Sequence, residues 1–319
     1  MKDSQSLPKK NKSKKTLPKT HIFDFAIILL LLDIASVALV VFYIHKINSY
    51  SIPKSSNQYL KVTQIPLSSD LNSINASAEA YVVYDPSTRS VVAGKNQNLR
   101  FSPASTAKVM TAVLAIEYYN LDQYLTVPDD IYSVQGSKMN LVPGEELTVR
   151  DLLYGMLLPS GNDAAYTLAY NYPGGIEGFV AKMNKRARDL GLSNTYFADP
   201  AGFEDGNYTT GAELARLGAF AMQKDFFREV VKTRTIDVNN RAFNHKFHLV
   251  NLNELLQFDN VLGIKTGYTN EAGGVLLTAI AKNGKLLIVA VLKSQDRFSD
   301  TKDIMNFIQE KVDFSYPEN

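Results

Sequence analysis

The order of apolar and polar positions divides the chain into four stretches of different character. Residues 1–20 are rich in lysine and have no apolar periodicity, which predicts a disordered tail. An almost continuously apolar segment and a polar segment rich in Ser and Asn follow, and alternating apolar patterns begin near residue 77. We therefore predict a basic tail at 1–20, an apolar anchor at 21–45, a polar stalk at 46–76 and a globular domain at 77–319.

Within the globular domain, strand patterns lie near both ends and helix patterns lie between them. Apolar runs predict strands at 81–84, 90–93, 261–267, 274–282 and 285–292, the last two joined by the two-residue turn Asn283-Gly284. Helical spacing predicts helices at 103–119, 149–158, 164–171, 178–190 and 300–312. This order indicates an α+β fold: both chain ends build one antiparallel sheet, helices cover both of its faces, and the middle of the chain forms a helical subdomain.

The apolar segment from Phe25 to Ile44 is long enough to cross a bilayer. As a helix, 20 residues span about 30 Å, the thickness of a hydrocarbon core. Asp33 near the middle costs about 2.5–3.5 kcal/mol, whereas the Leu, Ile, Phe and Val residues together contribute roughly 4–8 kcal/mol in favour of insertion. We therefore predict a transmembrane signal-anchor at 21–45.

A cleaved signal peptide is the alternative, because Ala35 to Ala38 resembles a cleavage site. Apolar residues continue for six more positions after Ala38, which favours an uncleaved anchor. Lysines precede the segment, so the positive-inside rule predicts a cytoplasmic N-terminus and an extracytoplasmic globular domain on a single-pass membrane protein.

Composition narrows the range of functions. The net charge of the 319 residues is +2, but residues 1–20 contain seven lysines and one aspartate, which leaves −4 for residues 21–319. The body of the chain therefore has no excess of positive charge for nucleic acid. The chain has no Cys, which excludes disulfides, thiol catalysis and cysteine-based metal sites.

The candidate chemistry begins with Ser105 and Lys108 in the sequence Phe101-Ser-Pro-Ala-Ser-Thr-Ala-Lys108. Ser102 is predicted as the helix N-cap, with Pro103 at the first helical position. Residues three apart share one face of a helix, so the hydroxyl and the amine should meet. Burial among apolar residues lowers a lysine pKa, which would make this amine a potential base.

The spacing Ser-x-x-Lys is weak evidence by itself, because it also occurs at residues 6–9, 51–54 and 299–302. Only the copy at Ser105 begins an apolar helix. It is followed by Ser160-Gly-Asn162 at a break between helices, 55 residues later, and by Lys265-Thr-Gly267 on a predicted strand, 105 residues after Ser160. These three elements in this order form a known catalytic constellation.

With these motifs the chain resembles the serine D-alanyl-D-alanine carboxypeptidases, the low-molecular-mass penicillin-binding proteins, from about residue 80 to 313. The resemblance extends beyond the three motifs to Leu157–Ala165, Gly263–Thr269, Leu190-Gly191 and Asp199-Pro-Ala-Gly202. It implies a β-lactamase/DD-peptidase-like fold, a peptidoglycan stem peptide ending in D-Ala-D-Ala as substrate, β-lactams as covalent inhibitors and no cofactor.

The resemblance also implies a role for each residue of the motifs. Ser105 would attack the penultimate D-Ala carbonyl with Lys108 as base. Ser160 would relay a proton to the leaving amine, and Asn162 would hold Lys108 or the substrate amide. The substrate-binding residues Lys265, Thr266, Gly267 and Tyr268 follow one another on one predicted strand. The side chains of Lys265 and Thr266 would bind the terminal carboxylate. The backbone N–H groups of Tyr268 and Ser105 would bind the oxyanion.

Departures from the family pattern are few. Gly211 and Glu213 stand where the family usually has Ala and Asp, at a helix start. Class A β-lactamases place a deacylating Glu on a loop between the second and third motifs, whereas this chain has the carboxypeptidase-like Asp199–Gly202 there. Slow turnover of β-lactams is therefore expected.

Other classes of enzyme fit poorly. His21 and His45 flank the apolar segment, and His245 and His248 are expected to have no nearby carboxylate partner, so no metal site is expected. A Ser-His-Asp triad lacks a Gly-x-Ser-x-Gly element. We predict a serine DD-carboxypeptidase, with a DD-endopeptidase or a penicillin-binding sensor without peptide turnover as alternatives.

Overall fold

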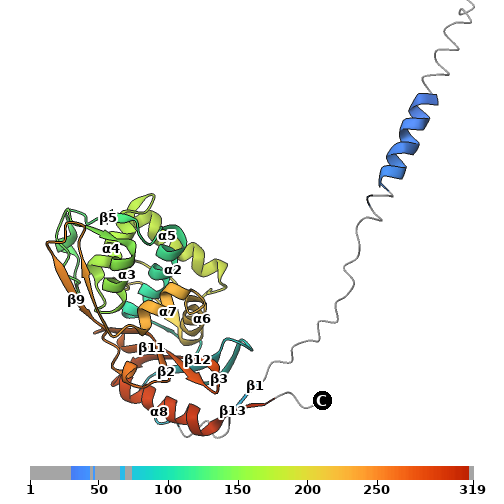
Figure 1. Ribbon diagram of the computed structural model, residues 1–319. Coiled ribbons are helices and arrows are strands. Elements are labelled where there is room, and N and C mark those ends of the chain that lie inside the picture. Colours follow the sequence, from blue (N-terminus) through green and yellow to red (C-terminus); the bar gives the residue numbers. More distant parts are fainter. Residues whose placement is uncertain (1–29, 44–45, 47–64, 69–73, 316–319) are drawn as a thin grey trace, which may run out of the picture. The chain divides into compact units, whose positions relative to one another are not determined.

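The computed structural model describes residues 30–43, 46, 65–68 and 74–315 (Figure 1). The chain divides into two compact units, Met1–Lys61 and Val62–Asn319, and each is described by itself. The predictions for the basic tail and for most of the stalk lie outside the described residues.

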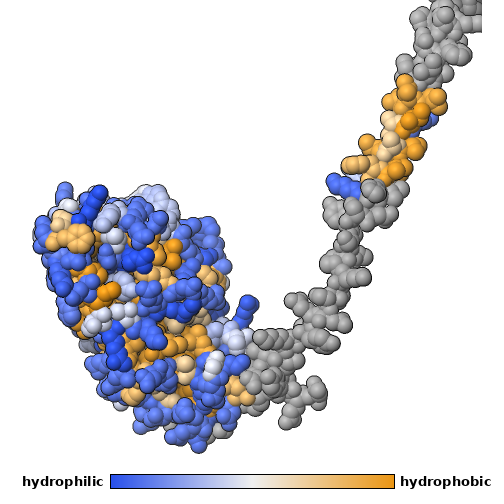
Figure 2. Space-filling view, in the orientation of Figure 1, coloured by the Kyte–Doolittle hydropathy of each residue, from blue (hydrophilic) through white to orange (hydrophobic). Residues whose placement is uncertain are grey.

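In the first unit, residues 30–43 form an α-helix whose side chains are all exposed. Its surface is mainly apolar (Figure 2), with Leu30 at 61% and Phe42 at 63% exposure. Among the described residues, no helix reaches the combined length and apolarity that crossing a membrane requires. The rest of the predicted anchor at 21–45, apart from this helix, lies outside the described residues.

A five-stranded antiparallel sheet built from both ends of the second unit confirms the predicted architecture. Its strand order is β10-β11-β12-β2-β3. The strands are β2 (Ala80–Asp85), β3 (Ser90–Lys95), β10 (Val261–Thr269), β11 (Gly273–Lys282) and β12 (Lys285–Ser294). The predicted turn between β11 and β12 is present, with positive φ at both Asn283 (51°) and Gly284 (73°), as a type I′ hairpin requires.

Helices cover both faces of this sheet, because its inner strands carry apolar residues that point to both sides. In β2, Val82 and Tyr84 join the large core cluster while Tyr81 and Val83 join a second cluster on the other face. Helix α6 (Gly211–Ala221) packs on the first face and α8 (Arg297–Lys311) on the second. The sheet is thus the middle layer of a three-layer structure (Figure 1).

The middle of the chain forms the predicted helical subdomain. Its helices are α2 (Lys108–Tyr118), α3 (Val149–Leu157), α4 (Asn162–Tyr170), α5 (Gly175–Asp189) and α7 (Asp225–Lys232), with 3-10 turns η2 (Ala104–Ala107), η3 (Ile131–Ser133) and η4 (Glu254–Gln257). Helix α2 is the central helix, since it contacts α3, α4, α5, α6 and α7. Residues 108–115 of α2 are buried without a break.

Four small two-stranded sheets were not predicted. They pair β1 (Ile65–Ser68) with β13 (Val312–Ser315), β4 (Arg100–Phe101) with β7 (Thr209–Thr210), β5 (Tyr124–Thr126) with β6 (Glu146–Thr148), and β8 (Thr235–Asn239) with β9 (Lys246–Val250). The first pair places a strand inside the segment predicted as stalk. Short strands of this kind are stabilised by distant partners, which leave little local signal.

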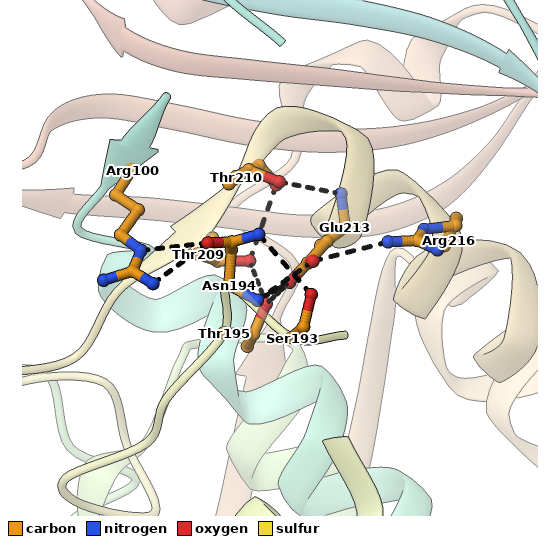
Figure 3. Close-up of polar contacts among 8 residues, drawn as sticks. All are labelled: Arg100, Ser193, Asn194, Thr195, Thr209, Thr210, Glu213 and Arg216. Carbon is orange, nitrogen blue, oxygen red and sulfur yellow. Dashed lines mark hydrogen bonds and ion pairs between the residues drawn. The ribbon is translucent and has the colours of Figure 1, made fainter. Parts of the chain in front are cut away.

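The start of α6 is fixed by a buried carboxylate at Glu213 (Figure 3). Thr210 caps the helix by accepting a hydrogen bond from the Glu213 N–H at 3.2 Å. The carboxylate accepts hydrogen bonds from the Asn194 N–H at 3.0 Å and the Thr195 hydroxyl at 2.6 Å, and it pairs with Arg216 at 3.4 Å. Glu213, one of the departures from the family pattern, therefore ties the loop after α5 to α6.

Replacing Glu213 should destabilise the domain far more than replacing its ion-pair partner. Glu213→Ala leaves the Asn194 N–H and the Thr195 hydroxyl without their charged acceptor, so the free energy of unfolding should fall by about 3 kcal/mol. Arg216→Ala removes an exposed charge and should cost less than about 1 kcal/mol. Equilibrium denaturation measures both values, and equal losses would contradict this account of α6.

Candidate active site

The turn that carries Ser105 begins differently from the prediction. Pro103, not Ser102, occupies the N-cap position of η2, and no side chain caps the turn, so the predicted cap was wrong. Ala104 has φ of +45°, a left-handed conformation that is unusual for a residue with a Cβ. This bend turns the chain from β4 into η2, and the α-helix proper starts only at Lys108.

Ser105 and Lys108 meet as predicted. The Lys108 Nζ lies 2.8 Å from the Ser105 Oγ and donates a hydrogen bond to the Ala201 carbonyl at 3.0 Å. Lys108 is wholly buried, and burial lowers its pKa to about 7, opposed by the negative charges of Asp199 and Asp163. Near neutral pH a large share of the amine is therefore unprotonated and can accept a proton.

The loop at 199–202 supplies the carbonyl that holds Lys108, a contact that the sequence analysis missed. The Asp199 carboxylate accepts hydrogen bonds from the Ala201 N–H at 2.9 Å and from the Asn207 amide at 2.7 Å. Gly202 has φ of +72°, and a Cβ there would lie 2.0 Å from the Ala104 carbonyl oxygen. The loop can lie this close to η2 because residue 202 is glycine.

The Ser160–Asn162 turn is held by backbone contacts on several sides. Ser160 is buried and has φ of +67°, and the next residue donates its N–H to the Gly155 carbonyl at 3.0 Å. The Asp163 carboxylate accepts hydrogen bonds from the N–H groups of residues 139, 140 and 141. A strained residue persists only where its surroundings fix it, as they do here.

Asn162 does not contact Lys108 by a hydrogen bond within the described residues. Its Nδ2 donates to the Gln135 carbonyl at 2.6 Å, and its Oδ1 is buried with no hydrogen-bond partner. Ser160 likewise makes no side-chain hydrogen bond to Ser105 or Lys108 in the part of the chain described by the structure. The prediction that Asn162 holds Lys108 or the substrate amide stays a prediction.

The third motif lies on β10, directly beside η2. A Cβ on Gly267 would lie 3.1 Å from the Ser105 backbone nitrogen, so glycine lets the strand approach the serine closely. Lys265 and Thr266 are buried, and the Lys265 Nζ donates to the Thr266 carbonyl at 3.0 Å. Tyr268 is 62% exposed at the open end of this contact.

Arg297, at the start of α8, adds a second cation that the sequence analysis missed. Burial, together with the positive charges of Lys108 and Arg297, lowers the pKa of Lys265 well below its usual value. The Arg297 Nε is buried without a hydrogen-bond partner. Neither group forms a salt bridge with another described residue, so the two are a candidate anion receptor, and a bound carboxylate would favour the charged form of Lys265.

No group of three or more candidate metal ligands occurs within the described residues. The two described histidines, which the sequence analysis left without a carboxylate partner, each have one: His245 lies 2.6 Å from Glu145, and His248 lies 2.7 Å from Asp237. They lie in separate pairs, and neither pair includes a residue of the three motifs.

A serine hydroxyl beside a buried amine, on an α+β scaffold of this kind, is the arrangement of a serine hydrolase with a lysine base. The family model described as D-alanyl-D-alanine carboxypeptidase matches residues 67–296. The chain therefore belongs to the serine-type D-alanyl-D-alanine carboxypeptidase family, as the sequence motifs predicted.

Individual relatives agree with this assignment. The chain is 38% identical over 234 residues to the D-alanyl-D-alanine carboxypeptidase of Streptomyces sp. strain K15, covering 67% of this chain and 80% of that protein. It is 37% identical over 222 residues to D-alanyl-D-alanine carboxypeptidase DacF of Bacillus subtilis, but spans only 57% of that relative's length. The crystal structure of the Streptomyces K15 DD-transpeptidase superposes with a TM-score of 0.69 at 33% identity, covering 73% of this chain and 97% of that one.

The rate at which a β-lactam acylates the protein should depend on the ionisation of Lys108. Because the pKa of Lys108 is about 7, the amine is protonated at lower pH and cannot accept the Ser105 proton. The second-order acylation rate should level off above pH 8 and fall about tenfold per pH unit below pH 6. Stopped-flow measurement between pH 5 and 9 tests this, with circular dichroism at each pH as a check on folding. A rate that stays flat down to pH 5 would exclude Lys108 as the base.

Proposed function

We propose that the protein removes the terminal D-Ala from peptidoglycan stem pentapeptides through an acyl-enzyme on Ser105. The observation that supports this most directly is the 2.8 Å contact between the Ser105 Oγ and the buried Lys108 Nζ, in a chain of the carboxypeptidase family. In the acylation step, the Ser105 Oγ attacks the penultimate D-Ala carbonyl and its proton passes to Lys108. The backbone N–H groups of Ser105 and Tyr268 stabilise the oxyanion.

The anion receptor on β10 selects the end of the peptide. Lys265 and Thr266, with Arg297 beside them, bind the terminal carboxylate. This places the last peptide bond next to Ser105, because Gly267 brings the strand against the serine. The site thereby favours peptides with a free C-terminus.

Collapse of the tetrahedral intermediate breaks the C–N bond and releases D-Ala. The leaving nitrogen needs a proton, which passes from Lys108 through the Ser160 hydroxyl. Water then hydrolyses the ester, and its proton passes to Lys108 as it did in acylation. β-Lactams acylate the same serine but leave an ester that turns over slowly.

Substitution of Ser105 separates this proposal from other functions of the same fold. Wild-type protein should be labelled covalently by a fluorescent penicillin and should release D-Ala from a model peptide ending in D-Ala-D-Ala. Ser105→Ala should abolish both signals, since the nucleophile is lost. The same peptide with a C-terminal carboxamide is the matched control for the anion receptor and should be cleaved at least tenfold more slowly, because it lacks the charge that the two cations bind. Equal labelling of Ser105→Ala and wild type would show that Ser105 is not the nucleophile.

A DD-endopeptidase that cleaves peptidoglycan cross-links is the second candidate. Chains named D-alanyl-D-alanine endopeptidase, from Pseudomonas aeruginosa and Escherichia coli, are 31% and 30% identical and are covered over 77% and 74% of their length. Digestion of cross-linked muropeptides would identify this activity. Labelling by penicillin without release of D-Ala or cleavage of cross-links would indicate the third candidate, a penicillin-binding sensor.

We also propose that residues 21–45 anchor the protein as a single membrane-spanning signal-anchor, with residues 1–20 in the cytoplasm and the catalytic domain outside the cell. The apolar sequence of 25–44 and the lysines before it support this topology. Recovery of the full chain in the detergent-soluble membrane fraction, and of a chain lacking residues 1–45 in the aqueous fraction, would be the expected pair of results. Recovery of the full chain in the aqueous fraction would contradict the anchor.

A further inference from the structure

The loop that supplies the Ala201 carbonyl is closed at its base. The Tyr196 N–H donates to the Tyr208 carbonyl at 2.8 Å, and the Tyr208 N–H donates to the Tyr196 carbonyl at 3.0 Å. The two tyrosine rings stack with their centroids 5.8 Å apart. Residues 199–202 in the middle of the loop are buried. Closure at the base restricts the loop, but it does not by itself orient the buried peptide groups near Lys108.

A hydroxyl on α2 binds this buried part of the loop. Thr111 is the one residue with a hydroxyl in the buried run 108–115, and it lies three residues after Lys108, on the same face of the helix. A threonine within a helix commonly donates to a carbonyl of its own helix. Thr111 instead donates to the Pro200 carbonyl at 2.6 Å. The only other described acceptor near its hydroxyl is the Met183 Sδ at 4.0 Å, which is a weak one.

The peptide unit between Pro200 and Ala201 is held from two opposite sides. A trans peptide is planar, and its carbonyl and N–H point in opposite directions. Thr111 binds the carbonyl, and the Asp199 carboxylate accepts a hydrogen bond from the Ala201 N–H at 2.9 Å. Within the described residues, the Pro200 carbonyl accepts no other hydrogen bond. On its carbonyl side, the orientation of this plane therefore depends on the Thr111 hydroxyl.

The orientation of the plane determines where the next carbonyl points. The Ala201 carbonyl follows the plane after a single Cα, and it accepts the hydrogen bond from the Lys108 Nζ at 3.0 Å. The same Nζ lies 2.8 Å from the Ser105 Oγ. Because a displacement of about 1 Å in a reacting group can lower a rate by about 10²-fold, rotation of this plane would be felt at the serine.

We propose that Thr111 is a positioning residue for the acylation of Ser105: its hydroxyl fixes the peptide plane between Pro200 and Ala201 and thereby holds the Ala201 carbonyl at the Lys108 amine. The inference rests on the proposed function, because that function makes Lys108 the base. Thr111 is wholly buried and does not contact the substrate. Loss of its hydroxyl should therefore slow the reaction and leave substrate binding unchanged.

The experiment removes the hydroxyl and then restores it. Thr111→Val keeps the shape of the side chain, and the limiting rate of acylation by a fluorescent penicillin should fall about 10- to 100-fold. The penicillin concentration that gives half of this rate should change by less than about twofold, because binding does not involve Thr111. Thr111→Ser keeps a donor for the Pro200 carbonyl, so its limiting rate should stay within about threefold of wild type.

Thr167→Val is the matched control. Thr167 is also wholly buried in a helix, but its hydroxyl donates to the Asp163 carbonyl of the same helix at 2.9 Å. Its limiting acylation rate should stay within about twofold of wild type, because the loop at 196–208 keeps its contacts. Circular dichroism and thermal unfolding show whether each variant is folded. If Thr111→Val does not fold, Thr111→Ala and Thr111→Ser give the same comparison, since these two side chains differ only in the hydroxyl.

Three results would overturn the positioning role. They are a wild-type rate in Thr111→Val, equal losses in Thr111→Val and either Thr111→Ser or Thr167→Val, and a loss that appears in the half-saturating concentration instead of the limiting rate. Each of these would leave the nucleophile and the base in place. Absence of acylation in the wild-type protein would instead overturn the proposed function, and the role of Thr111 with it.

Discussion

The structure of the site depends on burying one amine. An ammonium group in the interior of a protein is costly, so the fold must either pair Lys108 with charge or let it lose its proton. The environment of Lys108 lies between these limits. Among the described residues, only the Ser105 hydroxyl and the Ala201 carbonyl lie within hydrogen-bond distance of its amine. The negative charges of the Asp199 and Asp163 carboxylates act from further away. A pKa near 7 is the balance between desolvation and these two charges.

The same requirement explains why the backbone around the amine is unusual. Ala104 and Ser160 both have positive φ, and Gly202 and Gly267 both lie where a Cβ would press on η2. Strained residues of this kind cost of order 1–3 kcal/mol each. That cost is tolerated because three separate segments converge on one small volume, and only their combined packing excludes water from Lys108.

Much of this arrangement could be predicted from the sequence, and the failures have physical reasons. The five strands of the central sheet and the helices α2, α3, α4, α5 and α8 have strong local patterns, and Ser105, Lys108 and Gly267 do lie together. The start of α6 was expected only from the family pattern, because the glycines in this helix weaken its local signal, and the short strands were missed because their partners lie far away in the chain. The contact between Lys108 and the Ala201 carbonyl could not be predicted from the sequence, because every residue has a backbone carbonyl. Arg297, whose charge lowers the pKa of Lys265, was missed because it lies on α8, outside the three motifs.

The pairing of β1 with β13 has a mechanical consequence. Ile65 lies opposite Ser315 and Ser68 opposite Val312, so the chain enters and leaves this pair at the same end. A force that draws residues 65 and 315 apart would therefore open the ladder one rung at a time, like a zipper, instead of loading all its hydrogen bonds at once in shear. These two four-residue strands would separate first under such a force. The central sheet, which contains neither of them, would carry no load until they had separated.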